Sequence, residues 1–391
     1  MPARINYRYY PFIATQKEFP NLFIEKPSVL VPGNSVLRDK TIEVFKTIVE
    51  NGEVPVEAFS DHDESILVYN TILDIVKFIN DKRIANRVAL AYAKTASKAL
   101  NEEKNEVLVA IASKLGLKVK FDASNFPKIP LVVTEQRSVR VLFTTCPFSL
   151  PIQEYIMIVT PRLMHDQSYA LINHVVTGGR VFLDRNTFKR LLEEHIYYSI
   201  LLQIERTEPP STPDFVELVE GVKSTITSYQ EKLINKSVFL ELKPGRESPD
   251  STEKIVVEEL FPPCIKKIVD LINTGGNPSH LERFNLAAFL GYIGLDVDDI
   301  IEYFRKTPDF NEKIARYQVE HILGMRGGRK KYKPYNCENL KASNICPISG
   351  QCPGGKNPIA VYKYNIRRTL SRKKKRGGDQ VEKSEEAAGG I

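Results

Sequence analysis

The sequence predicts an α+β protein that is predominantly α-helical. A helical N-terminal domain carries a small α/β insertion, and a second helical domain follows. Apolar residues recur at helical spacing over most of the chain. Runs of β-like composition occur within about residues 129–185, and a charged Pro/Gly/Ser-rich stretch at residues 243–253 has no periodicity. With 391 residues, the chain is long enough for two domains.

The N-terminal part is helical after an irregular start. Leu37, Ile42 and Phe45 lie on one stripe, and Asn51-Gly52 is a typical helix end. Residues 66–79 are apolar on all sides, which is typical of a buried helix. The predicted order is an irregular Pro- and aromatic-rich segment at 1–35, then helices at 37–51, 66–79, 83–100 and 105–117.

A change of pattern marks the insertion. Strand-like runs cover residues 130–133, 139–144 and 179–184, with helical patterns between and after them. A mixed α/β element inserted in a helical domain explains this order. The accompanying helices are expected at residues 151–165, 187–204 and 213–234, and the last of them closes the domain.

The second domain begins after the aperiodic stretch. Its helices are predicted at residues 262–273, 278–293, 297–305 and 311–323, and from Gly324 the chain turns rich in Gly, Pro, Asn and Cys, which is typical of loops. We place the N-terminal domain at residues 1–240, a linker at 241–256, the second domain at 257–370 and a disordered tail at 371–391.

The basic charge is concentrated in one C-terminal stretch. Residues 321–376 hold 15 Lys and Arg but a single acid, Glu338, for a net charge of +14. The remainder of the chain has a net charge of −7. Such asymmetry favours a polyanionic partner, because each cation that neutralises a phosphate releases a condensed counterion. For Arg372–Arg376 a solubilising tail is an equally good interpretation.

Composition also bears on location. No apolar run reaches the roughly 18–20 residues of a membrane helix, and the first residues lack the apolar core of a signal peptide. We expect a cytoplasmic, nucleoid-associated protein, or a nuclear one if the source is eukaryotic. Five cysteines, an odd number without a secretory signal, argue against a disulfide framework and favour thiolates held by a metal.

Four of the cysteines lie in the second domain. Cys337, Cys346 and Cys352 are separated by 8 and 5 residues, and Cys264, at a predicted helix start, is separated from Cys337 by 72 residues. A multi-thiolate site would order loops that have few apolar side chains. The absence of a C-x2–4-C pair disfavours structural zinc, but spacing alone leaves an iron–sulfur cluster, zinc and ordinary buried thiols open. Cys146 is interpreted as a small buried hydrophobe.

A cation-rich loop follows the last predicted helix. Arg326, Arg329, Lys330 and Lys331 alternate with glycines and precede Tyr332. Cations for phosphates and a ring for stacking suit a nucleic-acid strand or end, without specifying a base sequence. For any single residue of the loop, a solvated side chain is an equally good interpretation.

Two acidic clusters are interpreted as structural. Polymerase chemistry needs carboxylates that hold two metal ions. The Asp61-His62-Asp63 run lies in a short polar gap between helices, and Asp296, Asp298 and Asp299 open a helix, where acids suit the helix dipole. Neither cluster has strand context, so no active site is expected in this chain.

Several motifs of the second domain occur together in a known family. The sequence resembles the large, regulatory, iron–sulfur subunit of archaeal and eukaryotic DNA primase over about 100 residues. The opening Tyr9-Tyr10-Pro11-Phe12 is weakly similar as well. The motifs are Phe261-Pro-Pro-Cys264, His280-Leu-Glu-Arg283 through Leu295, Ala315-Arg-Tyr317 through His321 and Gly324, Tyr335-Asn-Cys337, Cys346, Cys352 and Asn357-Pro358.

The resemblance implies that the four cysteines bind one [4Fe–4S] cluster and that the N-terminal domain docks on the catalytic small subunit in a heterodimer. It further implies a non-catalytic role, in which the C-terminal domain helps position template and initiating nucleotide for RNA primer synthesis in DNA replication. In the family, residues matching His280, Arg283 and Tyr317 contact nucleotide or nucleic acid. An accessory primase subunit is compatible with this role.

From the residues alone, Arg283 is interpreted as a surface arginine, whereas the resemblance favours a phosphate contact for it. His280 is interpreted as a residue that caps or hydrogen-bonds near a helix start. For Tyr317, a core position with Ile314 and His321 and a functional contact are equally good interpretations. Two other functions stay open. One is a zinc-stabilised nucleic-acid-binding adaptor without a primase role. The other is an iron–sulfur DNA-processing enzyme, although the phosphate loop of a helicase is absent.

Overall fold

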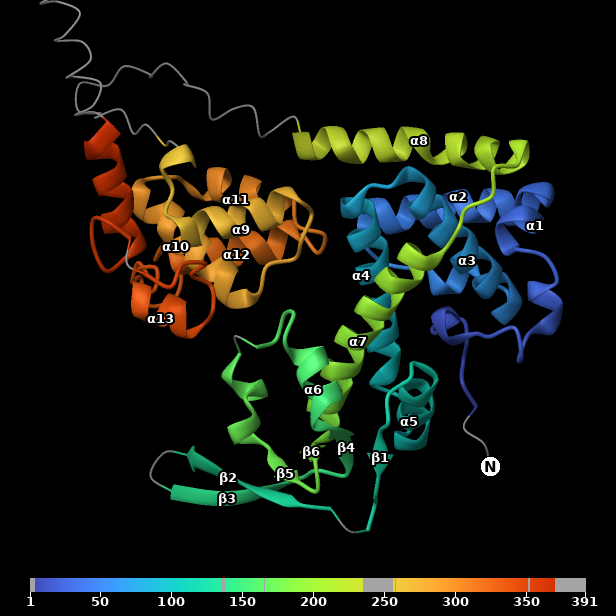
Figure 1. Cartoon of the computed structure of the whole chain (residues 1–391), viewed down its shortest axis with the longest axis horizontal. Helices are drawn as coiled ribbons and strands as arrows, with labels where there is room; N and C mark the ends of the chain where they lie inside the picture. Colours follow the sequence, from blue (N-terminus) through green and yellow to red (C-terminus); the bar gives the residue numbers. More distant parts are fainter. Residues whose placement is uncertain are drawn as a thin grey trace, which may run out of the picture. The chain divides into compact units, whose positions relative to one another are not determined.

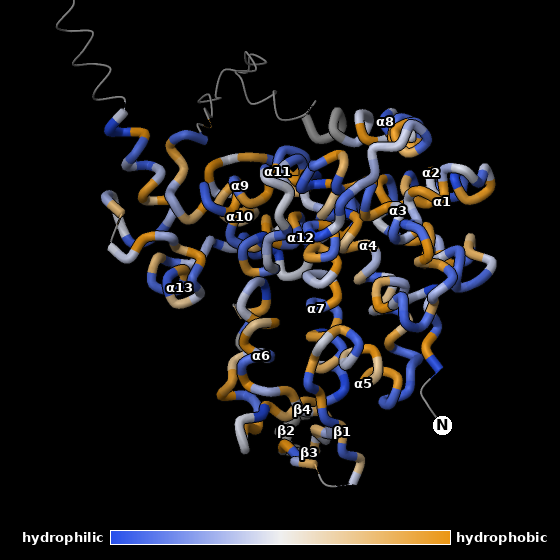
Figure 2. The backbone as a smooth tube through the Cα atoms, turned by 45° about the vertical axis from the view of Figure 1, so that its right-hand side comes forward, coloured by the Kyte–Doolittle hydropathy of each residue, from blue (hydrophilic) through white to orange (hydrophobic). Residues whose placement is uncertain are grey.

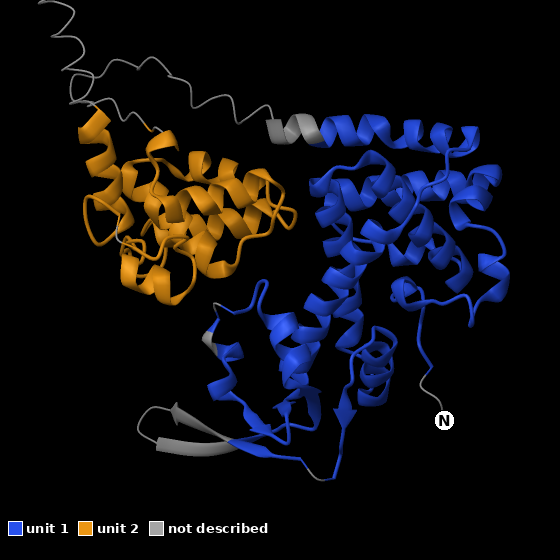
Figure 3. Ribbon diagram, viewed as in Figure 1, with its two compact units in different colours: residues 1–233 blue, residues 234–391 orange. Residues whose placement is uncertain are grey.

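The structure is a computed structural model that describes residues 4–124, 126–135, 138–164, 166–234, 256, 258–350 and 352–369. The chain divides into two compact units, Met1–Leu233 and Ile234–Ile391, each with its own hydrophobic core (Figure 3). Helices predominate over strands in an α+β fold, as the sequence predicts. Apart from Val256, the predicted linker lies outside the described residues, and so does the predicted disordered tail.

Unit 1 is built on helices whose ends match their sequence signals. The side chain of Asn34 accepts hydrogen bonds from the first amides of α2, and Gly52 ends this helix with a left-handed φ of 72°. Most of α3 is buried, as its apolar composition predicts. The helices are α1 (Pro27–Gly33), α2 (Ser35–Asn51), α3 (His62–Ile79), α4 (Lys82–Leu100), α5 (Asn105–Lys114), α7 (Arg185–Arg206) and α8 (Pro213–Ile234) (Figure 1).

The inserted element is antiparallel. One sheet has the strand order β1-β4-β6-β5, and β2 and β3 form a separate hairpin. Phe148 of β4 stacks on Phe188 of α7 with ring centroids 4.4 Å apart, so the sheet is anchored to a long helix of the domain. The elements are β1 (Lys120–Phe121), β2 (Lys128–Glu135), β3 (Ser138–Thr145), β4 (Phe148–Pro151), α6 (Ile152–Val159), β5 (Val175–Thr177) and β6 (Arg180–Leu183).

Unit 2 is helical in the described residues. The rings of Phe261, Phe289 and Tyr362 meet edge to face, with centroids 5.3–5.6 Å apart, and join three segments in one core. The helices are α9 (Pro263–Asn273), α10 (His280–Ile293), α11 (Val297–Arg305), α12 (Glu312–Ile322), α13 (Cys337–Ala342) and a last helix at residues 358–369.

The structure corrects the sequence prediction at both ends. The first segment is not irregular throughout, because α1 forms with Pro27 at its first position, where a missing N–H costs nothing. The loops expected after Gly324 contain α13, which Asn336 caps by accepting from the Asn339 amide, and the last helix. No helix in the described part of the chain has both the length and the apolarity to cross a membrane.

Candidate functional site

Three segments of unit 2 position the four cysteines. Cys264 lies in the first turn of α9 and is 5% exposed within the hydrophobic core. Cys337 begins α13, and its amide donates to the Lys356 carbonyl at 2.9 Å. The Cys346 amide donates to the carbonyl of Leu340 at 3.0 Å. Backbone hydrogen bonds therefore hold the chain in place at Cys337 and at Cys346.

The thiols are near enough to affect one another electrostatically. Burial, followed by the charges of Cys346, Cys337 and Cys352, raises the pKa of the Cys264 thiol to about 12. Burial, then Cys352 and Cys346, raises the pKa of Cys337 as well. The described residues hold no group of three His, Cys, Asp or Glu side chains placed to hold a metal ion. The structure therefore brings the predicted thiols into one neighbourhood without forming a closed site.

Cys146 lies in unit 1 and is separate from this group. It is buried between β3 and β4, which confirms the prediction of a small buried hydrophobe. Burial, followed by the charge of Asp184, raises the pKa of this thiol to about 11. A thiol that remains protonated at neutral pH is a poor nucleophile.

Arg283 is held by acceptors of its own unit. Its Nε donates to the Pro278 carbonyl at 3.0 Å, and its Nη2 donates to Asn277 and, at 2.5 Å, to the Asp309 carboxylate. No acceptor in the described part of the chain is assigned to Nη1, which is the donor left for an anion. The interpretation of Arg283 as a free surface arginine is therefore wrong.

The start of α10 lies beside Arg283. Ser279 and Glu282 form a capping box, which explains why Glu282 is buried although it is acidic. His280 is the first residue of the helix and is exposed. Its side chain is therefore accessible from solvent, three residues before Arg283 on the same helix.

The cation-rich loop is folded back on unit 2. Gly324 adopts a φ of 77°, where an added Cβ would lie 2.8 Å from the Lys331 amide nitrogen. Lys331 donates to the carbonyl of Gly291 at 2.8 Å and lies 5.0 Å from the centre of the Tyr292 ring. Lys331 thus attaches the loop to the end of α10, a structural contact that the sequence did not indicate.

Aromatic rings accompany the cations of this loop. Tyr317 is 57% exposed, as is Ile314, which excludes the core position that was one of the two interpretations of Tyr317. The Arg326 guanidinium lies 5.7 Å from the centre of the Tyr317 ring, and His321 stacks on Tyr332 with centroids 5.6 Å apart. We call the surface that Tyr317, His321, Arg326 and Tyr332 form at one end of α12 the ring-and-cation surface.

The other two cations of the loop, Arg329 and Lys330, are exposed, and neither side chain has an ion pair within the described residues. Both remain available to a ligand.

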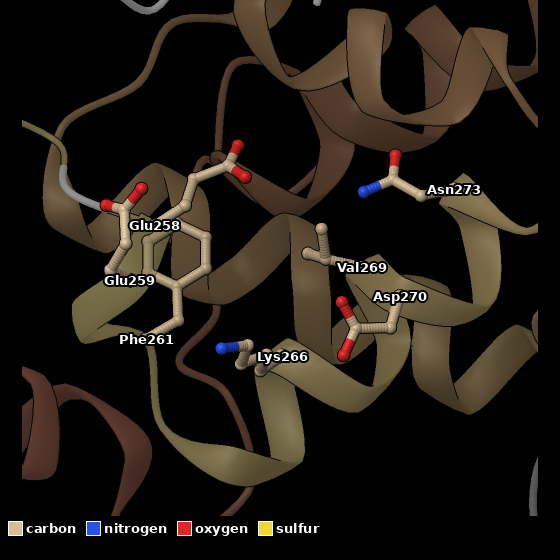
Figure 4. A pocket seen from close by; sticks show the side chains of 7 residues that line it. All are labelled: Glu258, Glu259, Phe261, Lys266, Val269, Asp270 and Asn273. Carbon is tan, nitrogen blue, oxygen red and sulfur yellow. The ribbon is translucent and has the colours of Figure 1, made fainter.

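The acidic clusters are structural, as predicted. Asp61 caps α3 by accepting from the Glu64 amide, and Asp296 caps α11 by accepting from the Asp299 amide, each at 2.9 Å. A pocket beside α9 also contains carboxylates, but none of the predicted site residues lines it (Figure 4). Its lining consists of Glu258, Glu259, Phe261, Lys266, Val269, Asp270 and Asn273.

Comparison with known proteins places these residues in a family. Residues 254–380 match the C-terminal domain of the large subunit of eukaryotic and archaeal DNA primase, and this match includes all four unit 2 cysteines and the ring-and-cation surface. These matches support the archaeal and eukaryotic primase large-subunit family for this chain. The family supports a role as a regulatory subunit in DNA replication.

Relatives with the name DNA primase large subunit PriL extend the match. The protein of Methanococcoides burtonii is 26% identical over 365 residues, which cover 91% of either chain. That of Methanopyrus kandleri is 47% identical over 103 residues, 26% of this chain and 25% of its own. That of Thermoplasma acidophilum is 30% identical over 178 residues, 46% of this chain and 48% of its own.

The sequence did not reveal the carboxylates that hold the site arginines. Asp309 is 26 residues from Arg283, and Glu320 precedes Arg326 across a turn. Within the turn, the glycines at 324 and 327 were the only available signal, since both suit a left-handed backbone. The partner of Arg283 follows from the packing of α10 against α11 and α12, and no local pattern encodes that packing.

Proposed function

We propose that this chain is the non-catalytic regulatory subunit of a DNA primase. It binds the catalytic small subunit and helps position template and initiating nucleotide during RNA primer synthesis. The observation that carries this proposal is that the four thiols and the ring-and-cation surface occur together within the residues that match the C-terminal domain of the primase large subunit. The relatives compared are archaeal, and we propose a cytoplasmic location on that basis.

We also propose that Cys264, Cys337, Cys346 and Cys352 bind a [4Fe–4S] cluster. The donor set fits, because it consists of thiols alone and comes from separate segments. A structural zinc site usually takes its cysteines as C-x2–4-C pairs, and the sequence contains no such pair. When bound, the cluster would cross-link α9 to the segment that carries the other three cysteines.

The nucleic-acid contact is proposed for the surface around α12 and the start of α10. Arg329 and Lys330 are exposed cations, Tyr317 presents a ring, and Arg283 keeps Nη1 available. Cations bind phosphates of any sequence, and rings stack on any base, which suits a subunit that acts at many template sites. His280 lies close enough along α10 to join Arg283 at a nucleotide phosphate.

The small subunit needs a docking surface, and we propose the exposed apolar side chains of α6 and the segment after it. Tyr155 of α6 ties this segment in place, since its hydroxyl donates to the Tyr169 carbonyl at 2.7 Å. The hydropathy colouring of α6 is largely apolar (Figure 2). A group of exposed apolar side chains of this kind is typical of a protein interface. Its members are Ile156, Met157, Met164, Leu171, Ile172 and Val176.

Co-expression with the small subunit tests this function. The complex should co-purify and synthesise RNA primers on a single-stranded template, whereas the large subunit alone should not. Ile172 is 91% exposed, so Ile172→Glu leaves the fold intact, and we expect it to weaken the complex roughly thirtyfold.

Val36→Glu is the matched control, because Val36 is an exposed apolar residue of the same unit outside the proposed surface. Equal loss of complex in both variants would contradict the docking surface. If the small subunit synthesised primers equally well with this chain and without it, the proposed function would be contradicted.

A further inference from the structure

Arg326 is engaged within its own unit. Its Nε pairs with the carboxylate of Glu320, while its guanidinium lies 5.7 Å from the centre of the Tyr317 ring. Tyr317 and Glu320 are one turn apart on α12, and Arg326 belongs to the turn that follows this helix. The side chains of Arg326 and Glu320 are 56% and 18% exposed, so the pair is at the surface but its acid is largely covered.

The backbone of the turn determines this contact. The Met325 amide donates to the Glu320 carbonyl at 2.8 Å, and the chain then reverses through glycines at 324 and 327, which have φ values of 77° and 67°. A Cβ at Gly327 would lie 3.1 Å from the His321 ring, so a larger residue at this position would require that ring to shift. Arg326 is therefore directed back over α12 by the fold.

The contact obstructs both groups that a strand would need. The guanidinium lies over one face of Tyr317, 5.7 Å from the ring centre, in the space that a base stacked on that face would take. Glu320 neutralises the charge with which Arg326 would bind a phosphate. Arg329 and Lys330 differ in this respect, because neither has an ion pair within the described part of the chain.

We propose that Glu320 sets the affinity of this surface for single-stranded nucleic acid, by holding Arg326 over Tyr317 until a strand displaces it. One phosphate takes the guanidinium from Glu320, and one unstacked base takes the uncovered ring. The inference rests on the proposed nucleic-acid contact of this surface. It identifies the ligand as a strand that offers a free base and a phosphate together, and it disfavours ligands that offer only one of them.

Salt dependence distinguishes this exchange from simple attraction. With Glu320 present, Arg326 must leave an ion pair that salt itself weakens, so the loss of this pair offsets part of the salt dependence of the phosphate contact. Without that carboxylate, the phosphate contact keeps its full salt dependence, a slope of log K against log salt of about 0.7 for each contact with a single strand. A surface ion pair of this kind corresponds to about a two- to fivefold change in affinity.

The experiment uses the full chain and a fluorescein-labelled oligothymidylate, with binding measured by anisotropy at several salt concentrations. We expect Glu320→Gln to bind about two- to fivefold more tightly at low salt and with the steeper slope. Glu312→Gln is the matched control, since it removes the same charge from the same helix at an acid that pairs with Arg305 and Arg316. Its affinity and slope should equal those of the wild type.

A second readout follows the ring itself. The chain has no tryptophan, so Tyr317→Trp gives a single indole reporter. We expect oligothymidylate to quench this indole, and inorganic polyphosphate, which has no base, to leave it unquenched. Quenching should occur at lower oligothymidylate concentration when Glu320→Gln is added.

Equal affinity and slope in Glu320→Gln and the wild type would overturn the inference. If Arg326→Gln then still weakened binding, the proposed nucleic-acid contact would stand without the displacement step. If the wild type did not bind oligothymidylate at all, the proposed contact and the inference would both be wrong.

Discussion

Two parts of unit 2, residues 258–323 and residues 324–357, are ordered by different interactions. In the first part, α9 to α12 bury apolar faces in a common core that includes Phe289 and Ile300. In the second part, the buried residues among those described are Pro334, Leu340 and Ile345. The first part is held by apolar burial, as most globular domains are, whereas the second has too little apolar surface for this.

Polar attachments hold the second part instead. Lys331 donates to the Gly291 carbonyl, the Tyr335 amide donates to Asn285, and Lys267 donates to the carbonyl of Asn344, at 2.8–3.1 Å. A hydrogen bond contributes about 0.5–1.5 kcal/mol, whereas fixing one residue's backbone costs roughly 1–2 kcal/mol. The attachments are fewer than the residues they order. The difference indicates why the proposed cluster matters to this segment and not to the helices.

Iron removal should produce the largest difference in hydrogen-exchange protection between the two parts. Anaerobic chelation of the reduced protein is expected to abolish most of the hydrogen-exchange protection of residues 324–357 while α9 to α12 keep theirs, because metal-binding free energy orders the thiol segment. Hydrogen exchange measured by mass spectrometry gives both values in one experiment. Equal protection of residues 324–357 before and after chelation would contradict the proposed cross-link.

Truncating the core should affect both parts. Phe289→Ala removes a fully buried ring that packs against Phe261 and Tyr362, at an expected cost of about 3–5 kcal/mol in the free energy of unfolding of unit 2. Urea denaturation of the full chain should show an earlier transition for unit 2 and an unchanged one for unit 1, which has a separate core. A simultaneous shift of both transitions would show that the units do not unfold independently.

The sequence predicted the first part of unit 2 far better than the second. α9 to α12 follow from helical periodicity and from caps such as Ser279 and Asn311. α13 is only six residues long and lies among Asn, Gly and Cys, so no periodicity could develop. In unit 1 the three-residue β5 was missed for the same reason.

The candidate site was predictable as residue types but not as contacts. The four cysteines and the cations of residues 326–331 were found from composition and spacing. The carboxylates that pair with Arg283 and Arg326, and the attachment of Lys331 to Gly291, depend on tertiary packing. Charge patterns along a sequence do not reveal which cations are already paired.

A single polar attachment should matter to the second part alone. Asn285 is fully buried, and its Oδ1 accepts from the Tyr335 amide at 2.8 Å. Asn285→Ala leaves that amide without its acceptor, at a cost of about 1–3 kcal/mol. Amide exchange at Tyr335 and Cys337 should accelerate more than exchange in α11. Unchanged exchange at Tyr335 would show that this hydrogen bond does not hold the segment.

The smallest effect is expected at Lys331. Lys331→Met keeps an apolar stem but loses the bond to Gly291 and the contact with the Tyr292 ring, which is worth about 0.5–1 kcal/mol at an exposed site. Thermal denaturation should shift slightly, and exchange should rise between residues 325 and 333. Lys330→Met is the control, because the Lys330 side chain has no partner in the described part of the chain. An equal shift in the two variants would contradict the anchoring role of Lys331.

Anaerobic purification followed by visible absorbance and iron and zinc analysis tests the central proposal most directly. The wild type and Cys146→Ser should be brown, with about four irons per chain, and Cys337→Ser should lose that iron. A colourless wild type would contradict the iron–sulfur proposal. One zinc ion per chain would then favour a zinc-stabilised adaptor, and the absence of metal would favour ordinary buried thiols.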